Sequence, residues 1–228
     1  MARLMATDFP ERSPLYTIYD TAELITLGSK CHVARYGEVD ELAQLQLGGL
    51  VDLSNLPRAG FRGTQAAQYL EEKGYTLPQR PNQAVVQPGG ELILRLSQTE
   101  YFLLGSLADG GARIEQEEAA WSLSDSACYL LPRQDSHAWL VMTGAHCPDV
   151  MAKVCGVDLG ESAFPAGSVA QTSVARINCI VVNVAGQTPR LQILCDRASA
   201  HYLWHALLDA FNEFGGKAVG IEALQRLS

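Results

Sequence analysis

The stretch LPRQDSHAWLVMTG (residues 131–144) decides the fold. The sequence features that begin with it also begin with LPRAGFRG (residues 56–63), and they follow in the same order. In both places a Leu-Pro-Arg run leads through a short apolar segment to a glycine. A helical pattern follows, and it ends at Gly74 in the first case and at Gly156 in the second. The chain is therefore predicted to contain two copies of one plan.

Each copy continues with a proline-containing connection and then with short apolar runs that are rich in strand-forming residues. The expected strands are 83–86, 92–96 and 101–104 in the first copy, and 174–177, 180–184 and 191–194 in the second. Each copy then ends in a longer helix. A repeat this long that occurs twice favours a pseudo-twofold domain over a solenoid, which needs three or more units to be stable.

Three ranges follow from this pattern. Residues 1–50 form an N-terminal extension that packs on the duplicated core or on a partner, because their apolar residues show no clean period. Residues 51–126 form the first half, and residues 127–228 form the second half with its C-terminal helix. The seam between the halves is expected at 122–126.

Local signals place the helices and one turn. Helices are expected at 40–47, 65–73, 115–121, 148–155 and from Ser199 onward. Thr64 is expected to cap the second of these and Cys147 the fourth, while Gly74 ends the second in a left-handed conformation. The pair Gly89-Gly90 predicts a hairpin turn between two strands, since glycine tolerates positive φ angles.

Composition excludes several classes of function. The chain has 228 residues, of which 47% are hydrophobic, and a net charge of −8. Nucleic acid binding is not expected, because it needs clustered Lys and Arg. The first 16 residues hold no apolar run, so neither a signal peptide nor a membrane span is expected, and the location is taken as cytoplasmic. The six cysteines are interpreted as free thiols.

Two clusters of reactive residues have weak claims to chemistry. His201, His205 and Asp209 are spaced to share one helix face, as metal ligands often are, but that stripe opposes the apolar face, so no metal site is expected. Cys147 follows His146 at a helix N-terminus, a setting that lowers a thiol pKa, although one thiol with a sequence neighbour does not make a catalytic pair. The alternative for both is an ordinary surface or cap.

Three arginines stand in or beside predicted strands: Arg58, Arg95 and Arg176. A guanidinium in such a setting has to be paired. Each is therefore either a structural ion-pair member, which is favoured for any one of them, or an anchor for a carboxylate, a ligand or a partner.

Three passages carry a resemblance to a known family. They are residues 52–63, residues 81–83 with the following 91–104, and residues 164–167 with the following 172–176. In this order they resemble the gamma subunit of heterotetrameric sarcosine oxidase, within the glycine-cleavage T-protein family of tetrahydrofolate-binding aminomethyltransferases. The resemblance spans roughly 51–215. It implies a duplicated α+β fold with antiparallel sheets and flanking helices.

The resemblance also implies a role beside a flavoprotein that demethylates an N-methylated amine, with tetrahydrofolate accepting the one-carbon unit. The aminomethyltransferases carry a catalytic aspartate in a Gly-x-x-Asp-Asp run, where this chain reads Gly89-Gly90-Glu91-Leu92. Glu91 is a poor substitute, because its carboxylate lies one methylene further out and catalysis is sensitive to small displacements. The chain also ends before the C-terminal barrel domain expected of full T-proteins.

The expected function is a non-catalytic, gamma-like accessory subunit of a multi-subunit flavin-dependent sarcosine oxidase or a related demethylase. Its partners are flavoprotein subunits that hold the flavin, and this chain holds no cofactor. The alternative is a stand-alone tetrahydrofolate-binding aminomethyltransferase-like protein. No catalytic residue is expected, and the candidate folate- or partner-binding residues are Arg58, Glu91 and Arg176.

Overall fold

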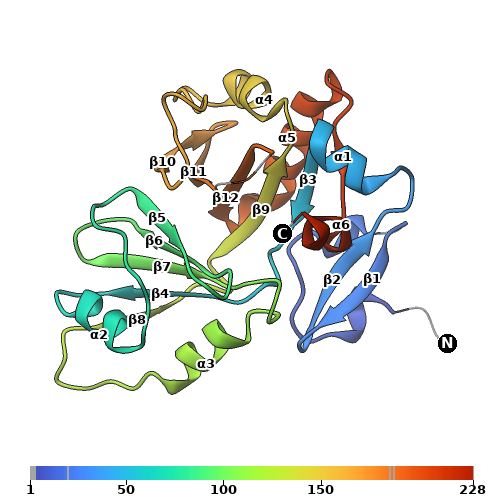
Figure 1. Cartoon of the computed structure of the whole chain (residues 1–228). Coiled ribbons are helices and arrows are strands. Elements are labelled where there is room, and N and C mark those ends of the chain that lie inside the picture. Colours follow the sequence, from blue (N-terminus) through green and yellow to red (C-terminus); the bar gives the residue numbers. More distant parts are fainter. Residues whose placement is uncertain (1–3, 20, 185, 187, 228) are drawn as a thin grey trace. The chain divides into compact units, whose positions relative to one another are not determined.

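The fold is described from a computed structural model of the chain (Figure 1), which describes residues 4–19, 21–184, 186 and 188–227. The chain divides into two compact units. Unit 1 comprises Met1–Asn55, His137–Ala166 and Ala170–Ser228, and unit 2 comprises Leu56–Ser136 and Gly167–Val169. The chain therefore leaves unit 1 after Asn55 and returns to it at His137.

Unit 2 is built on an antiparallel sheet with the strand order β5-β6-β7-β4-β8. Its strands are β4 (Arg58–Arg62), β5 (Gln83–Val86), β6 (Leu92–Arg95), β7 (Glu100–Leu104) and β8 (Tyr129–Pro132). The four apolar residues of β7, Tyr101–Leu104, are all buried. This agrees with the prediction from their unbroken apolar run, because such a run has no face left for solvent.

Unit 1 is built on a larger sheet with the strand order β10-β11-β12-β9-β3-β13. Its strands are β3 (Gly49–Asp52), β9 (His137–Thr143), β10 (Val169–Val174), β11 (Ile177–Asn183), β12 (Arg190–Asp196) and β13 (Lys217–Ala218). The ladders from β11 through β12 and β9 to β3 are antiparallel, and β13 joins β3 in parallel. In the same unit, β1 (Glu23–Leu27) and β2 (Lys30–Arg35) form a small sheet.

The α-helices range in length from 6 residues in α6 to 13 residues in α5. They are α1 (Glu41–Leu47), α2 (Ala66–Glu72), α3 (Ala112–Ala120), α4 (Cys147–Val154), α5 (Ala200–Asn212) and α6 (Ile221–Arg226). Among the described residues, short 3-10 helices occupy Ala6–Asp8, Tyr16–Ile18 and Arg197–Ser199.

The two main sheets share one topology. The series strand, helix, three strands, helix runs from β4 to α3, and the same series runs from β9 to α5. In both sheets the four strands of the series stand in the order second, third, fourth, first. The next strand lies outside the series in each case: β8 follows α3 along the chain and pairs with β4, and β3 precedes β4 and pairs with β9. This confirms the duplicated α+β fold that the sequence predicts.

The exchange of β3 and β8 explains why the compact units do not follow the order of the sequence. Backbone pairing holds β3 in the sheet of unit 1 although it precedes β4, and it holds β8 in unit 2 although it precedes β9. The division of the sequence into an N-terminal extension (1–50), a first half (51–126) and a second half (127–228) stays a prediction. Of those ranges, residues 1–3, 20, 185, 187 and 228 lie outside the described residues.

Two helices cover one face of each main sheet. In unit 2, α2 and α3 lie on one side of the sheet (Figure 1), and Ala66, Leu70 and Ile114 pack against Phe61 and Ile93. In unit 1, α4 and α5 pack in the same way on residues of β3, β9, β11 and β12. Burying one such Leu, Ile or Phe side chain stabilises the fold by about 1.5–3 kcal/mol. Each unit thus has a core of its own.

Several helix predictions are confirmed. Asp40 caps α1 by accepting from the backbone N–H groups of Leu42 and Ala43, and α1 ends at Gly48. Gly74 follows α2 at φ +80, as a left-handed helix stop requires. The last long helix, α5, begins directly after Ser199.

Two predicted helix caps are wrong. Gln65, not Thr64, precedes α2, because the Gln65 side chain accepts from the backbone N–H of Ala127 at 2.7 Å and ties the helix start to the segment before β8. Cys147 is itself the first residue of α4, and His146 is the cap. The helix expected from residue 115 begins earlier, at Ala112, because the Asp109 carboxylate accepts from the backbone N–H groups just before and inside its first turn.

The expected strand at 174–177 is also wrong. Ala175 and Arg176 have φ angles of +48 and +67, and they form the two-residue turn between β10 and β11. Positive φ at both central residues is typical of a type I′ hairpin turn. The sequence did not show this turn, because Ala and Arg are not residues that usually adopt that conformation.

Candidate functional site

Glu91 lies at the end of the β5–β6 hairpin turn. Gly90 precedes it at φ +90, and the Gln87 N–H donates to the Glu91 carbonyl at 2.7 Å. A Cβ at Gly89 would stand 2.6 Å from the Glu91 carboxylate, and one at Gly90 would stand 2.6 Å from the Ser106 hydroxyl oxygen. The two glycines therefore allow the turn to close over the carboxylate, and Glu91 is only 2% exposed.

Arg113 is the charged partner of Glu91. Its Nη1 lies 3.5 Å from Glu91 Oε1, and its guanidinium lies 4.3 Å from the centre of the Tyr75 ring. Among the described residues, Glu91 Oε2 has no hydrogen-bond partner. Burial raises the pKa of Tyr75 to about 12, although Arg113 opposes the rise, so Tyr75 stays neutral at physiological pH. The carboxylate is thus enclosed by an arginine, an aromatic ring and backbone.

Arg58 is fully buried at the start of β4. Its guanidinium donates to the backbone carbonyl of Leu56 at 2.9 Å and to that of Gln134 at 3.0 Å. These carbonyls belong to the two segments that connect β3 to β4 and β8 to β9. Arg58 therefore links the two connecting segments within unit 2 through its Nη1 and Nη2 atoms.

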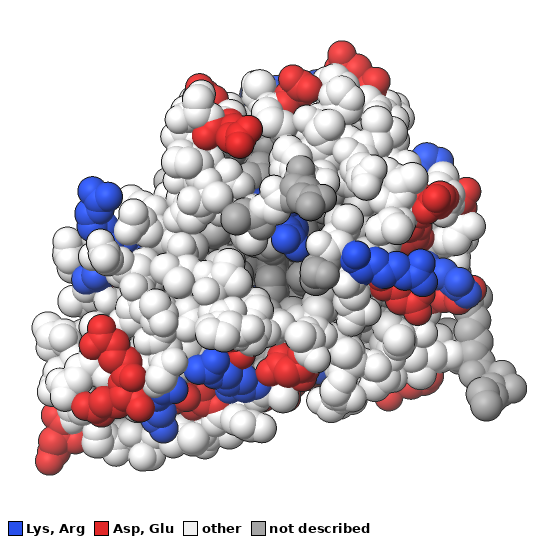
Figure 2. Space-filling model, viewed as in Figure 1, with Lys and Arg blue, Asp and Glu red and all other residues white. Residues whose placement is uncertain are grey.

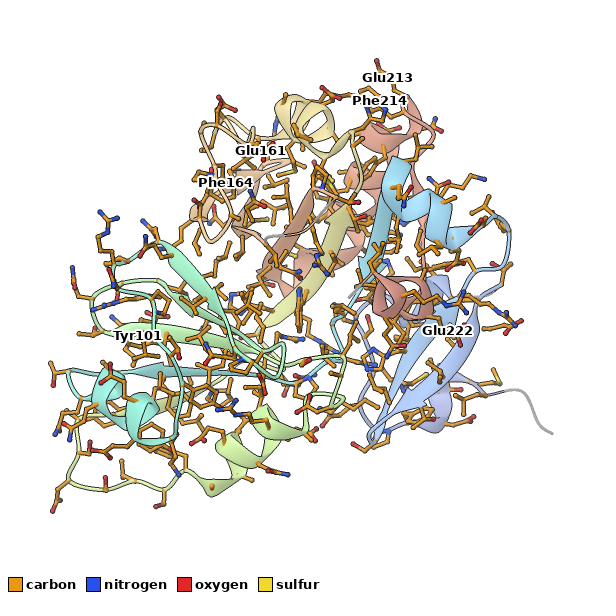
Figure 3. All side chains as sticks on the ribbon, viewed as in Figure 1. Tyr101, Glu161, Phe164, Glu213, Phe214 and Glu222 are labelled. Carbon is orange, nitrogen blue, oxygen red and sulfur yellow. The ribbon has the colours of Figure 1, made fainter. Side chains whose placement is uncertain are left out.

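Arg95 also serves the backbone. Its guanidinium donates to the carbonyls of Pro78, Gln79, Ser97 and Gln98. It also lies 5.5 Å from the ring centre of Tyr101, which lies on the neighbouring strand β7 (Figure 3). The local pairing expected for an arginine in a strand is confirmed, and its partners are carbonyl groups rather than a carboxylate.

Arg176 differs from the other two arginines because it is exposed. It lies in unit 1 at the turn between β10 and β11, and it lines a surface depression together with Lys153 and Tyr202. Tyr202 is 55% exposed. An exposed guanidinium beside an exposed aromatic ring is able to contact a partner, whereas Arg58 is not.

The structure brings two of the three candidate residues to one end of a sheet. Arg58 pairs across the ladder with Leu104, and Leu104 pairs with Leu92, the neighbour of Glu91. Arg58 and Glu91 therefore lie at the same end of the sheet in unit 2, two strands apart. Arg176 belongs to unit 1.

The two clusters with weak claims to chemistry have clear positions. His201, His205 and Asp209 are exposed on α5, and the two imidazole rings lie 6.5 Å apart. Within the described part of the chain, no three His, Cys, Asp or Glu side chains are grouped to hold a metal ion. Cys147 is buried in the first turn of α4 and burial raises its pKa well above the ordinary value, so it is neither an activated thiol nor a cap in contact with solvent.

A buried carboxylate in unit 1 was not singled out from the sequence. Asp52, at the end of β3, accepts hydrogen bonds from the hydroxyls of Ser13 and Tyr19 and from the backbone N–H of Ser54. Burial and then Asp52 raise the pKa of Tyr19 well above its usual value. The only local signal was the Asp-x-Ser spacing of an Asx turn, since Ser13 and Tyr19 are distant in sequence. This cluster fastens the N-terminal segment to β3.

Nearby, His32 is buried on β2. Burial lowers the pKa of His32 to about 4, with Lys30 contributing, and Asp52 opposes the change. Its Nε2 atom has no hydrogen-bond partner among the residues that the structure describes. His32 is therefore neutral at pH 7 and supplies no positive charge to the Asp52 cluster.

The surface shows no single dominant charge on the face in Figure 2, where Lys and Arg stand among Asp and Glu and most of the area is uncharged. A basic patch of the kind that binds phosphate backbones is not seen on this face. Among the described helices, none combines the length and the apolar character needed to cross a bilayer.

The fold and the repeated topology define an α+β protein, and a solved aminomethyltransferase shares this fold. The sequence profile of the GCVT N-terminal domain matches residues 34–228, so the chain belongs to that family. The family resemblance inferred from the ordered motifs is thereby confirmed.

Two curated relatives agree with this membership. The chain is 26% identical over 187 residues to the sarcosine oxidase subunit gamma of Corynebacterium sp. (strain P-1), a match that covers 79% of this chain and 89% of that protein. It is 23% identical over 197 residues to the aminomethyltransferase of Clostridium botulinum (strain 657 / Type Ba4), covering 78% of this chain and 51% of that protein. The chain thus spans about half the length of that aminomethyltransferase.

Two solved structures share the fold. A chain of the heterotetrameric sarcosine oxidase from Corynebacterium sp. U-96 matches with a TM-score of 0.66 and 20% identity, over 91% of this chain and 97% of that one. The glycine cleavage system aminomethyltransferase T from Bartonella henselae matches with a TM-score of 0.71 and 16% identity, over 94% of this chain and 60% of that one.

Proposed function

We propose that this chain is a non-catalytic, gamma-like accessory subunit of a multi-subunit, flavin-dependent sarcosine oxidase or a related demethylase of N-methyl amines. Partner subunits hold the flavin, tetrahydrofolate accepts the one-carbon unit in the complex, and this chain holds no cofactor. The similarity to a sarcosine oxidase subunit gamma over 89% of that protein's length supports the assignment.

The burial of Glu91 carries the proposal. The family resemblance places the catalytic aspartate of the aminomethyltransferases at the turn that holds Glu91 here. A catalytic acid or base has to come within hydrogen-bond distance of the group that it serves. The Glu91 side chain is only 3% exposed and its carboxylate faces Arg113 at 3.5 Å. An acid that is enclosed in this way supports a non-catalytic role.

The other candidate residues point in the same direction. A folate glutamate tail needs a guanidinium with free donors, and Arg58 directs Nη1 and Nη2 to backbone carbonyls instead. Because both side chains are buried, Arg58 and Glu91 are not placed to bind tetrahydrofolate. Arg176 is exposed, and we assign it to partner binding, since arginine and tyrosine are frequent anchors at protein interfaces.

Co-purification tests the accessory role. The full-length chain, tagged and expressed in its own cells, is expected to bring down a flavin-containing protein in a fixed ratio, seen by flavin absorbance and mass spectrometry. Arg176→Glu is expected to weaken the association, and Arg62→Glu, at an exposed arginine of unit 2, serves as the matched control. Recovery of a monomer without any flavoprotein would contradict the proposal.

Titration with tetrahydrofolate separates the proposal from the alternative of a stand-alone folate-binding aminomethyltransferase-like protein. The purified chain is expected to give no saturable signal by calorimetry. Saturable binding that Glu91→Gln weakens, while the fold measured by circular dichroism is unchanged, would favour the alternative. In that case Glu91 is a binding residue and the accessory role is overturned.

A further inference from the structure

Cys179 on β11 and Cys195 on β12 stand directly opposite each other in the antiparallel ladder of unit 1. The two strands are neighbours in the sheet, as Figure 1 shows. Directly opposite residues direct their side chains to the same face, and both thiols belong to the core that α4 and α5 cover. All six cysteines lie within the described residues, and each is a free thiol.

The backbone spacing of such a pair suits a disulfide. Opposite residues of an antiparallel ladder have Cα atoms about 4.5 or 5.5 Å apart, depending on the hydrogen-bonding pattern. A disulfide needs Cα atoms roughly 4.4–6.8 Å apart. Both values of the ladder fall within this range, so Cys179 and Cys195 need no movement of the strands to bond.

The surroundings of the two thiols predict that their oxidation is slow and begins at Cys179. Burial raises the pKa of Cys179 to about 12, and the neighbouring Cys195 adds to the rise. Burial, with Asp196 and Asp52, raises the pKa of Cys195 to about 12. Cys179 keeps 5% of its surface exposed and Cys195 only 1%, so the oxidant is expected to reach Cys179 first.

We propose that Cys179 and Cys195 form an oxidisable dithiol site, which hydrogen peroxide converts to a cross-strand disulfide. In the first step peroxide oxidises the Cys179 thiol to a sulfenic acid and releases one water. In the second step the Cys195 sulfur attacks the Cys179 sulfur, the hydroxyl leaves, and a second water forms with the Cys195 proton. Two thiols and one peroxide thus give one disulfide and two waters.

Cys155 is the competing thiol. It is only partly buried, it pairs in an isolated bridge with Val174, and it contributes to the electrostatic surroundings of Cys179. It does not stand opposite Cys179 in the ladder, whereas Cys195 does. The register therefore selects Cys195 as the partner, and a bond between Cys155 and Cys179 is the outcome that would overturn this choice.

Peptide mapping distinguishes these bonds. The folded, full-length chain is treated with hydrogen peroxide, its remaining thiols are alkylated under denaturing conditions, and it is digested with trypsin. Cleavage after Lys153, Arg176, Arg190 and Arg197 places the three thiols in the separate peptides 154–176, 177–190 and 191–197. Peptides 177–190 and 191–197 are expected as one joined species that a reductant separates. If they stay separate while Cys155 is oxidised, the proposal is wrong.

Two variants sharpen the test. Cys195→Ala is expected to abolish the joined species, and Cys31→Ala, a buried cysteine that stands opposite Thr26 on β1, is expected to leave it unchanged. Oxidation of the wild-type chain is expected to raise its Tm by on the order of 5 °C, because the bond closes a loop in the unfolded chain and so lowers its conformational entropy. The rise should be absent in Cys195→Ala and present in Cys31→Ala. A joined species that forms without any rise in Tm, or only after unfolding, would contradict a site in the native sheet.

Discussion

The two units place their candidate residues in equivalent hairpins, and the hairpins differ in length. In unit 2 the β5–β6 connection is long enough to fold back, and it buries Glu91 against Arg113. In unit 1 the β10–β11 connection has two residues, and Arg176 projects into solvent. The same topology thus places an enclosed carboxylate, Glu91, in unit 2 and an exposed guanidinium, Arg176, in unit 1. The length of a turn decided which side chain is able to meet a partner.

The units also differ in how they bury polar groups. Unit 2 holds a charged guanidinium, Arg58, which donates to backbone carbonyls. Unit 1 holds a carboxylate, Asp52, with three donors around it, and a neutral imidazole, His32. In both units these groups lie where the chain crosses or where the N-terminal segment packs. Polar groups buried in this way specify how segments distant in sequence come together, and their removal tests each unit separately.

The largest effect is expected from Arg58→Ala. The substitution removes a fully buried side chain and leaves the carbonyls of Leu56 and Gln134 without their donor, so the free energy of unfolding should fall by about 3–5 kcal/mol. Arg176→Ala, at an exposed arginine of the other unit, is the control and should change it by less than about 0.5 kcal/mol. Urea unfolding followed by circular dichroism measures both. Equal losses would refute the contrast between the two arginines.

The second effect depends on pH and concerns unit 1. The pKa of His32 is lowered by burial from 6.5 to about 4, so the unfolded chain binds a proton below pH 6.5 that the folded chain resists. Stability from this residue is therefore present above pH 6.5 and lost as the pH falls toward 4, by roughly 2–3 kcal/mol. His32→Gln should unfold with a flatter pH dependence between pH 7 and pH 4. The same slope in both proteins would show that His32 is not the responsible group.

The third prediction isolates the turn that encloses Glu91. Gly90→Ala places a Cβ at φ +90 and 2.6 Å from the Ser106 hydroxyl oxygen, and it should lower the free energy of unfolding by about 1–3 kcal/mol. Gly74→Ala is the matched control, since it has a similar φ of +80 but open space around its Cβ. Thermal unfolding of both variants separates the cost of a positive φ, which they share, from the cost of the contact with Ser106, which only Gly90→Ala makes. A smaller loss for Gly90→Ala than for Gly74→Ala would argue against the tight closure.

The smallest effect is expected in the equivalent turn of unit 1. Ala175→Asn combined with Arg176→Gly supplies the residue pair that a type I′ turn prefers, and it should raise the free energy of unfolding by about 0.5–1 kcal/mol. The same double variant should lose affinity for the flavoprotein partner if Arg176 is an anchor. A variant that is more stable and binds unchanged would separate the turn from the proposed interface.

Sequence patterns predicted much of the regular structure, because local physics dominates there. The apolar run 101–104 predicted a buried strand, Asp40 predicted the start of α1, and Gly74 predicted the end of α2. Each of these signals acts over a few residues. The turn at Ala175 and Arg176 was missed for the same reason: its conformation is imposed by the pairing of β10 with β11, and neither residue announces it.

The candidate site shows the same division. The sequence pointed to Glu91, Arg58 and Arg176 through residue type and family resemblance, but their exposure was not visible in it. Asp52 was passed over, because two of its hydrogen-bond partners, Ser13 and Tyr19, are more than thirty positions away. A signal for such a cluster exists only once the chain has folded.

The amino-acid sequence by itself determined that the chain repeats one plan of strand, helix, strands and helix, because hydrophobic period and glycine position act locally. Only the tertiary structure decided that β3 pairs with β9 and β8 with β4, and that Cys179 stands opposite Cys195. The physical reason is that the backbone N–H and C=O groups that pair two strands are nearly the same in every residue, so they do not specify the partner strand. The partner strand is selected when the apolar residues of each unit are buried in its core.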